Sequence, residues 1–237
     1  MTLSAPIHLL KRRARLLSRS DRIPLHAALD RIAADEGYRS WSLLVATQPR
    51  PETAHALLPR LAPGDLVLMA GRPGQGKTLA GLALLAEAVK AGRRGIFFTL
   101  EYTPLDVAAR LRSLGIDRDA IAGLFDCDCS DAISAAYIVG ALATAPHATV
   151  AVIDYLQLLD QRRDTPELGV QVRTLRTFAR ERGLVLVFLS QIDRSYDASE
   201  KPFPDIADVR LPNPLDLSLF DKACFLSRGE ARFGATR

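Results

Sequence analysis

Residues 71–78 could bind a polyphosphate, because they match the pattern G-x-x-x-x-G-K-[ST] at every fixed position. The apolar run 66–70 before them is typical of a buried strand, and 79–91 is typical of a helix. A glycine-rich turn between strand and helix points backbone N–H groups and the positive end of the helix dipole at one spot. We predict that the whole loop holds phosphate: Gly71, Arg72, Pro73, Gly74, Gln75, Gly76, Lys77 and Thr78.

Two members of this loop also carry chemistry beyond binding. Lys77 would reach the β- and γ-phosphates, and Thr78 would place its hydroxyl on Mg²⁺. The sequence therefore predicts a nucleotide, with Mg²⁺, as the cofactor. A chance glycine turn between a strand and a helix is the alternative.

Three polar side chains follow other predicted strands. Asp154 ends the strand 149–154, Glu101 follows 95–100 and Gln191 follows 184–189. Ligands of open α/β sheets collect at the carboxyl ends of the strands. Asp154 would bind Mg²⁺ through water, Glu101 could polarise an attacking water as general base, and Gln191 could hydrogen-bond the γ-phosphate or that water. Asp154 could instead cap a helix, but the phosphate loop favours the metal role. Glu101 or Gln191 alone would be an ordinary strand-end residue, and their shared edge makes them candidates.

Five segments resemble, in order, motifs of the RecA-like ATPase domain of replicative DNA helicases of the DnaB type: GRPGQGKT, FFTLEYTP, VAVIDYLQLLD, LVLVFLSQIDRS and FPDIADVR. The resemblance covers residues 52–228, and the runs 154–157 and 190–195 are its most particular parts. It implies hydrolysis of ATP with Mg²⁺, coupled to binding or unwinding of single-stranded DNA in replication or repair.

The resemblance also assigns roles to individual residues. Lys77 and Thr78 carry phosphate and Mg²⁺, Glu101 is the catalytic base, Asp154 the acid on the metal side, and Gln191 the nucleotide sensor. Arg110 falls where the family has an arginine beside the nucleotide base, although an arginine on a helix surface is the other interpretation.

The chain also departs from that family. Such helicases resemble rings in which a neighbouring subunit supplies a basic residue, an arginine finger, from a hairpin beyond the last strand. After Arg228 the later arginines are Arg232 and Arg237, so we expect that hairpin and the family's N-terminal domain to be missing. The expected partners are therefore single-stranded DNA and either a homo-oligomeric ring or a protein that supplies the finger. The long segment 193–212 suits a DNA-binding loop better than 160–166.

The order of patterns predicts an α/β fold. It has a RecA-like P-loop core, at 61–237, whose mainly parallel sheet is flanked by helices, after a small helical unit at 1–47 and a linker at 48–60. Strands are expected near 66–70, 95–100, 123–127, 149–154, 184–189 and 222–226. Helices are expected near 76–92, 104–114, 131–144 and 166–182.

The first 47 residues predict three short helices. The first spans 7–18, the second is capped by Ser20 or Asp21 and ends at Gly37, and the third runs from Trp41 after a Ser40 cap. The order fits a helix-turn-helix, but three helices on one small core give the same pattern, with Trp41 at its centre.

Composition sets the remaining bounds. The net charge is +4, and six basic residues among the first 22 positions suit either a nucleic-acid contact or a solvated helix face. Three cysteines are too few for a disulfide framework, and Cys127 and Cys129 lack the second ligand pair of a zinc site. No apolar run reaches the roughly 18 residues of a membrane span, so we expect no membrane partner and a cytoplasmic location.

Two other functions fit the sequence. An ATP-dependent switch or adaptor without helicase activity would use the helical unit to hold a protein partner. A small-molecule kinase would use the same phosphate loop, but the sequence shows no evident lid or acceptor site for one.

Overall fold

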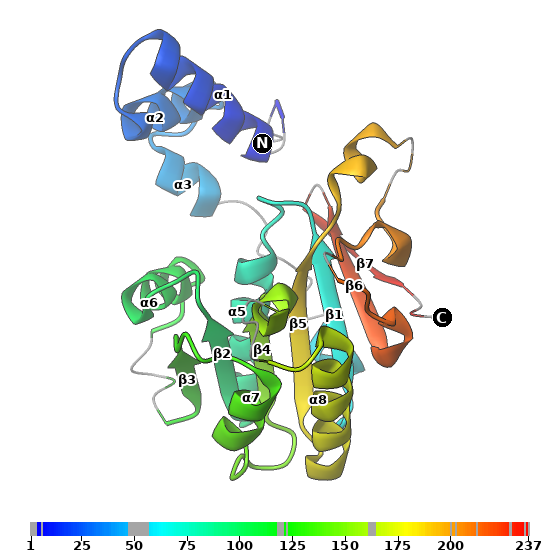
Figure 1. Ribbon diagram of the computed structural model, residues 1–237. Coiled ribbons are helices and arrows are strands. Elements are labelled where there is room, and N and C mark those ends of the chain that lie inside the picture. The colour runs from blue at the N-terminus through cyan, green and yellow to red at the C-terminus, as the bar shows by residue number, and fades with distance from the viewer. Residues whose placement is uncertain are drawn as a thin grey trace. The chain divides into compact units, whose positions relative to one another are not determined.

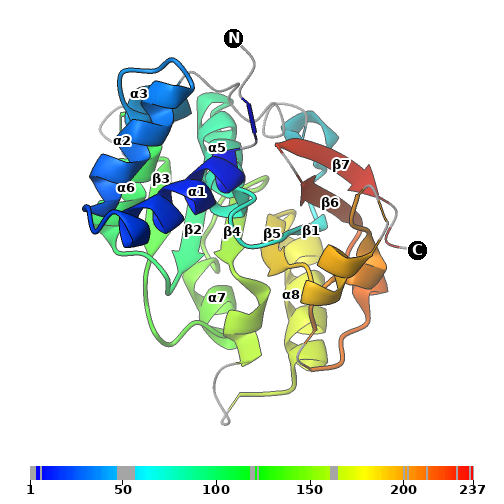
Figure 2. The ribbon, with the colours of Figure 1, turned by 90° about the horizontal axis from the view of Figure 1, so that it is seen from above.

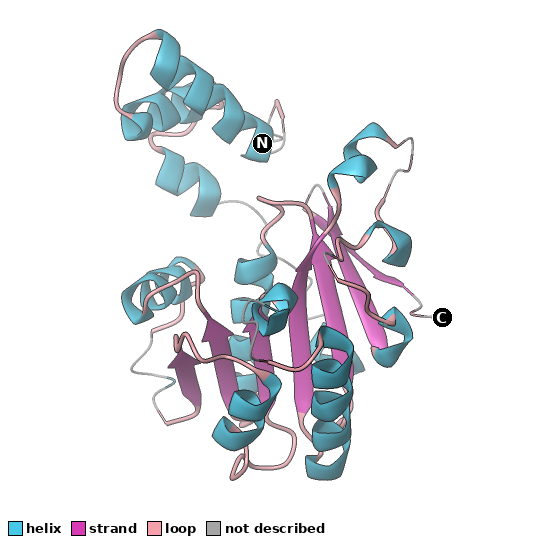
Figure 3. Ribbon diagram, viewed as in Figure 1, coloured by secondary structure: helices cyan, strands magenta, loops and turns pink. Residues whose placement is uncertain are grey.

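Seven strands of the computed structural model form one sheet, in the order β3-β2-β4-β5-β1-β6-β7 (Figures 1 and 3). The structure describes residues 4–5, 7–46, 57–117, 121, 123–160, 165–199, 201, 203–211, 213–227, 229–234 and 236. The strands are β1 (Leu66–Gly71), β2 (Gly95–Thr99), β3 (Phe125–Asp128), β4 (Val150–Asp154), β5 (Val185–Gln191), β6 (Lys222–Ser227) and β7 (Glu230–Gly234). The strands β1 to β6 pair in parallel, which confirms the predicted fold class.

Helices cover both faces of the sheet. Along each central strand, alternate side chains enter one of two buried clusters, as the pleat requires. One cluster packs against α7 (Ala135–Ala141) and α8 (Leu168–Arg182), and the other against α5 (Lys77–Lys90) and α6 (Pro104–Ser113). Figure 2 shows α5 and α8 on opposite sides of the strands. Burial on both faces explains why the strands read as continuous apolar runs.

The strand β7 corrects one expectation. It pairs antiparallel with β6, from Ala223 opposite Gly234 to Ser227 opposite Glu230, so a hairpin follows the last predicted strand. Its side chains alternate between exposed and half-buried, as in an edge strand with one covered face. Five residues of this kind give little apolar signal. Arg228 and Arg237 lie outside the described residues.

The chain divides into two compact units, Met1–Arg50 and Pro51–Arg237. Most of the predicted linker 48–60, namely residues 48–56, lies outside the described residues, and Leu57 is fully buried in the second unit. The first unit contains α1 (Ile7–Ser20), α2 (Leu25–Asp35) and α3 (Trp41–Ala46).

The core of the first unit is small. Leu10, Ala33 and Leu44 are buried, and the half-buried Trp41 packs against them instead of forming the centre. The predicted cap of α3 is confirmed, because the Ser40 hydroxyl accepts from the N–H of Leu43 at 3.2 Å.

The predicted cap of α2 is wrong. Ser20 ends α1, Asp21 pairs with Arg31 at 3.1 Å, and Pro24 precedes α2 without a side-chain cap. Proline fixes a backbone angle that suits a helix start, so α2 begins there.

The buried side-chain amide of Gln171 joins three elements that surround the end of the strand β4 in the sequence. Gln171 of α8 is 1% exposed. Its Oε1 accepts from the N–H of Ala135 at 3.0 Å, and its Nε2 donates to the carbonyls of Pro166 and Leu159. Leu159 belongs to the 3₁₀-helix η3 (Leu156–Asp160), which follows the end of β4. Gln171 therefore ties α7, α8 and η3 together.

Replacing this amide tests its importance. We expect Gln171→Leu to lower the free energy of unfolding by about 2–4 kcal/mol, because buried backbone groups lose their partners. Urea denaturation measures the change. The control Thr177→Ala, at an exposed position of α8, should change it by less than about 0.5 kcal/mol. Equal stability of Gln171→Leu and the control would contradict the assignment.

Candidate nucleotide site

The phosphate loop joins β1 to α5, and its glycines serve two purposes. Gly74 and Gly76 have φ angles of +83° and +81°, a left-handed conformation that side chains disfavour. Gly71 has ordinary angles, but a Cβ there would lie 2.9 Å from the carbonyl oxygen of Leu226 on β6. The loop thus needs glycine for its turn at two positions and for close packing at a third.

Lys77 begins α5 and folds its ammonium back over the loop. Its Nζ donates to the carbonyl oxygens of Gly71 at 3.0 Å and Arg72 at 3.3 Å. Burial lowers the pKa of Lys77, and the charges of Asp154 and Glu101 partly oppose that effect. The ammonium therefore rests on two carbonyls that a bound phosphate would replace.

Thr78 and Asp154 connect the loop to the strand β4. The Thr78 hydroxyl donates to the Asp154 carboxylate at 2.8 Å, across 76 positions of sequence. Asp154 is 3% exposed, and this burial raises its pKa from 3.8 to about 6. The Thr78 hydrogen bond opposes the rise and the Glu101 charge adds to it. A hydroxyl and a carboxylate are oxygen donors of the kind that Mg²⁺ takes.

Glu101 and Gln191 lie at the same edge of the sheet. Glu101 follows β2 and is exposed, and its charge acts on both Lys77 and Asp154. Gln191 ends β5 opposite Gly71 in the parallel register. Its Oε1 accepts from the Arg210 guanidinium at 3.3 Å. The structure thus brings the predicted carboxylates, the amide and the loop together.

Arg110 lies on α6, which a Thr103–Asp106 capping box begins. Its guanidinium carbon lies 3.8 Å from the ring centroid of Tyr102, and it donates to the carbonyl of Asp106. Its charge lowers the pKa of Asp154 against the dominant effect of burial, so Arg110 acts on the same site. Contact with a nucleotide base stays a prediction.

Three contacts at this edge had no signal in the sequence. Arg72 forms an ion pair with Asp197. The side-chain amide of Gln157 donates to the carbonyl of Arg210 at 2.9 Å. The guanidinium carbon of Arg232 lies 4.4 Å from the centroid of the Phe203 ring. Each joins segments that are distant in the chain, so local patterns could not indicate them.

Most of the predicted DNA loop, 193–212, belongs to the described residues. It contains the 3₁₀-helices η4 (Arg194–Ala198) and η5 (Ile206–Asp208), and Ile192 bridges to Val209. Pro212 lies outside the described residues, as do residues 161–164 of the shorter candidate loop. Among the described helices, none is long and apolar enough to cross a membrane.

Comparisons with known proteins agree with this geometry. A DnaB replicative helicase of Synechocystis sp. is 29% identical over 180 residues, which is 62% of this chain and 20% of the helicase. DnaB of Helicobacter pylori strain J99 is 25% identical over 199 residues, 70% of this chain and 40% of the helicase. The chain thus spans less than half the length of these relatives.

Solved structures show the same fold. A DnaB-like replicative helicase superposes with a TM-score of 0.59 at 18% identity, covering 73% of this chain and 54% of the helicase. A KaiC-like protein of Pyrococcus horikoshii superposes with a TM-score of 0.51 at 20% identity, covering 68% of this chain and 70% of that protein. These similarities confirm the RecA-like fold and the resemblance to DnaB.

The family itself follows from a sequence profile. The profile of the KaiC ATPase matches residues 56–208, which is more than half of the chain and includes the phosphate loop, Glu101, Asp154 and Gln191. The chain therefore belongs to the KaiC ATPase family.

Proposed function

We propose that this ATPase-family chain hydrolyses ATP in a Mg²⁺-dependent reaction. The observation that carries the proposal is the Thr78–Asp154 hydrogen bond of 2.8 Å beside Lys77, because it joins the phosphate loop to a buried carboxylate. Thr78 and Asp154 would hold Mg²⁺, which offsets phosphate charge when it is bound.

The other residues take complementary roles in this proposal. Lys77 exchanges the carbonyls of Gly71 and Arg72 for phosphate oxygens. Glu101 accepts a proton from the attacking water, since an exposed carboxylate at this edge can reach solvent. Gln191 bonds the γ-phosphate or the water, and Arg110 lies beside the base.

We further propose that hydrolysis is coupled to single-stranded DNA. The relatives named above are replicative DNA helicases, and the segment 193–211 lies next to Gln191, since the N–H of Arg210 donates to the Gln191 carbonyl at 2.7 Å. Its exposed Arg194 and Arg210 can neutralise backbone phosphates. A second copy in a ring, or a protein partner, would supply the arginine finger. A cytoplasmic location is part of the same proposal.

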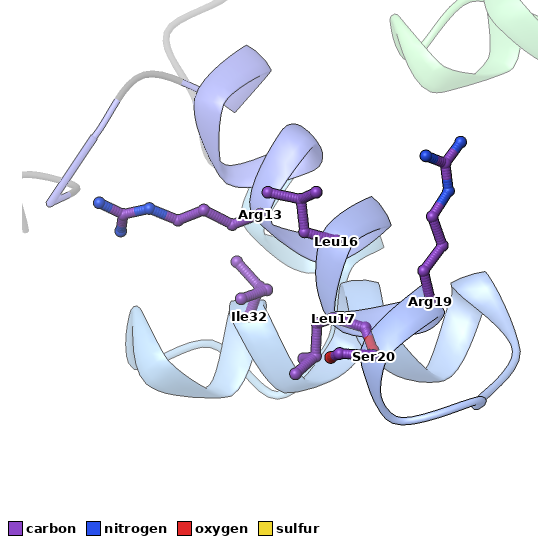
Figure 4. Close-up of a pocket in the computed structure, with 6 residues that line it drawn as sticks. All are labelled: Arg13, Leu16, Leu17, Arg19, Ser20 and Ile32. Atoms are coloured by element: carbon purple, nitrogen blue, oxygen red, sulfur yellow. The ribbon is translucent and has the colours of Figure 1, made fainter.

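A pocket in the first unit favours a second candidate, the switch or adaptor. The helices α1 and α2 form an open pocket of about 690 Å³, lined by Leu16, Leu17 and Ile32 with Ser20, Arg13 and Arg19, and in Figure 4 the two arginine side chains extend away from the apolar ones. Leu16, which lines the pocket, is 59% exposed. An apolar surface of this kind suits a protein partner better than a phosphate backbone.

Two variants test the hydrolytic site. We expect Lys77→Ala to weaken Mg²⁺–ATP binding about 10- to 100-fold, since a charge-assisted hydrogen bond is lost. Glu101→Gln should keep the affinity but lower kcat about 10²- to 10⁴-fold, because the amide is not a base. Titration calorimetry and a phosphate-release assay give the two values. The control Glu181→Gln, at an exposed position of α8, should match the parent, and full activity of Glu101→Gln would refute the general-base role.

Titration of the ATPase with single-stranded DNA separates the two candidate functions. Coupling to DNA predicts that kcat rises with added DNA and that the rise fades as salt increases, because phosphate contacts are electrostatic. An ATPase rate that DNA does not change, in protein that binds ATP, would favour the switch or adaptor.

Asp154 gives a prediction for stability. The buried carboxyl is protonated in the folded protein between its ordinary pKa of 3.8 and its folded pKa of about 6. Its contribution to stability is therefore complete below pH 3.8 and is lost as pH rises through 6. At pH 8 without Mg²⁺, Asp154→Asn should raise the free energy of unfolding by about 1–3 kcal/mol, since the amide carries no charge and still accepts from Thr78.

Urea unfolding in EDTA at pH 8 and pH 4 checks this prediction. The gain should be small at pH 4, where the parent carboxyl is protonated, and the control Asp126→Asn at an exposed pair should show no comparable gain at pH 8. A loss of stability for Asp154→Asn at both pH values would contradict the assignment.

A further inference from the structure

The side chain of Arg72 bridges the phosphate loop to the segment after β5. Its Nε and one terminal nitrogen donate to the two carboxylate oxygens of Asp197 at 3.0 and 2.6 Å. Its other terminal nitrogen donates to the carbonyl of Ile192 at 3.0 Å. The guanidinium thus holds both ends of residues 192–197. Both partners, Ile192 and Asp197, lie 120 or more positions from Arg72 in the sequence.

The backbone of Arg72 belongs to the phosphate loop. Its carbonyl accepts from Lys77 Nζ at 3.3 Å and from the N–H of Gln75 at 3.2 Å. Lys77 must leave this carbonyl to reach a phosphate. Arg72 is therefore one of the two residues, with Gly71, whose carbonyl would lose Lys77 when the loop fills, and its side chain also holds Asp197.

Backbone hydrogen bonds anchor the start of the segment held by Arg72: the N–H of Ile192 donates to the Gly71 carbonyl at 3.2 Å, and the N–H of Asp193 donates to the Asp208 carbonyl at 2.7 Å. In η4, Arg194, Ser195 and Asp197 are exposed, while Tyr196 is half-buried against the core. Asp193 caps the turn by accepting from the N–H of Ser195 at 2.9 Å. The cap sets the local shape of the turn, whereas the Arg72 contacts join it to the loop.

The strength of the pair suits a coupling role better than a structural one. Asp197 is 57% exposed, and exposed ion pairs contribute about 0.2–1 kcal/mol. That energy is small beside the stability of a domain, but it is enough to shift a local equilibrium severalfold. The Arg94–Asp126 pair has a similar exposure and distance and joins the residue before β2 to the edge strand β3, far from the loop in the sheet order.

We propose that Arg72 is a positioning residue that transmits the filling of the phosphate loop to residues 193–199. This route is additional to Gln191 and runs through a side chain of the loop itself. This proposal rests on the proposed function, because it assumes that Mg²⁺–nucleotide is the ligand that fills the loop. Through η4 it reaches the segment 193–211 proposed for DNA.

Hydrogen exchange of peptides covering 193–199 tests the proposal, with full-length protein and Mg²⁺ plus a non-hydrolysable ATP analogue. In the parent, the analogue should slow exchange, because phosphate bound to the backbone N–H groups of the loop would fix the Arg72 backbone after Lys77 has left its carbonyl. Asp197→Asn should speed exchange about 1.5- to 5-fold without the analogue, and should lose most of the slowing with it. Asp197→Glu, which keeps a carboxylate, should restore the slowing in part, and Asp126→Asn should behave like the parent.

Calorimetry on the same samples separates the two proposals. If the parent does not bind the analogue, the proposed function fails. If the analogue binds and slows exchange equally in the parent and Asp197→Asn, the function stands and the role of Arg72 is refuted. Equal effects of Asp197→Asn and Asp126→Asn would refute it as well.

Discussion

The hydrogen bond between Thr78 and Asp154 is the contact on which the site depends. It places a carboxylate against the start of α5 inside the protein, where the charged form is costly. Under the proposed function, a cation held by Thr78 and Asp154 would offset that cost. The parallel pairing of β1 with β5, and of β5 with β4, sets the distance that makes the bond possible.

The sheet explains why chemistry gathers at one edge. All the parallel strands end on the same side of the sheet. Residues that follow four different strands therefore lie close together although they are far apart in the sequence. The alternation of side chains between two helical layers leaves no freedom in register, since a slip of one residue would move every buried side chain to the other face. Ordinary packing thus fixes the positions of Glu101, Asp154 and Gln191.

Much of this could be predicted from the sequence, and the exceptions have physical causes. Apolar runs such as 150–153 and the phosphate loop carry strong local signals, so the parallel strands lay within two residues of their predicted places. The strand β7 has a weak signal because one face is open. The Ser20 or Asp21 cap failed because Pro24 starts the helix without one. The Arg72–Asp197 pair forms only because the fold brings together two residues 125 positions apart, and no local pattern in the sequence indicates that contact.

Gly71 ties the loop to the far edge of the sheet. Its missing side chain lets β1 come within contact of the Leu226 carbonyl, and β6 in turn carries the hairpin strand β7. A displacement of the hairpin would therefore move the Leu226 carbonyl against Gly71, the first residue of the phosphate loop. Any neighbour that docks on β7 would have a mechanical path to the nucleotide, without touching a single side chain of the site.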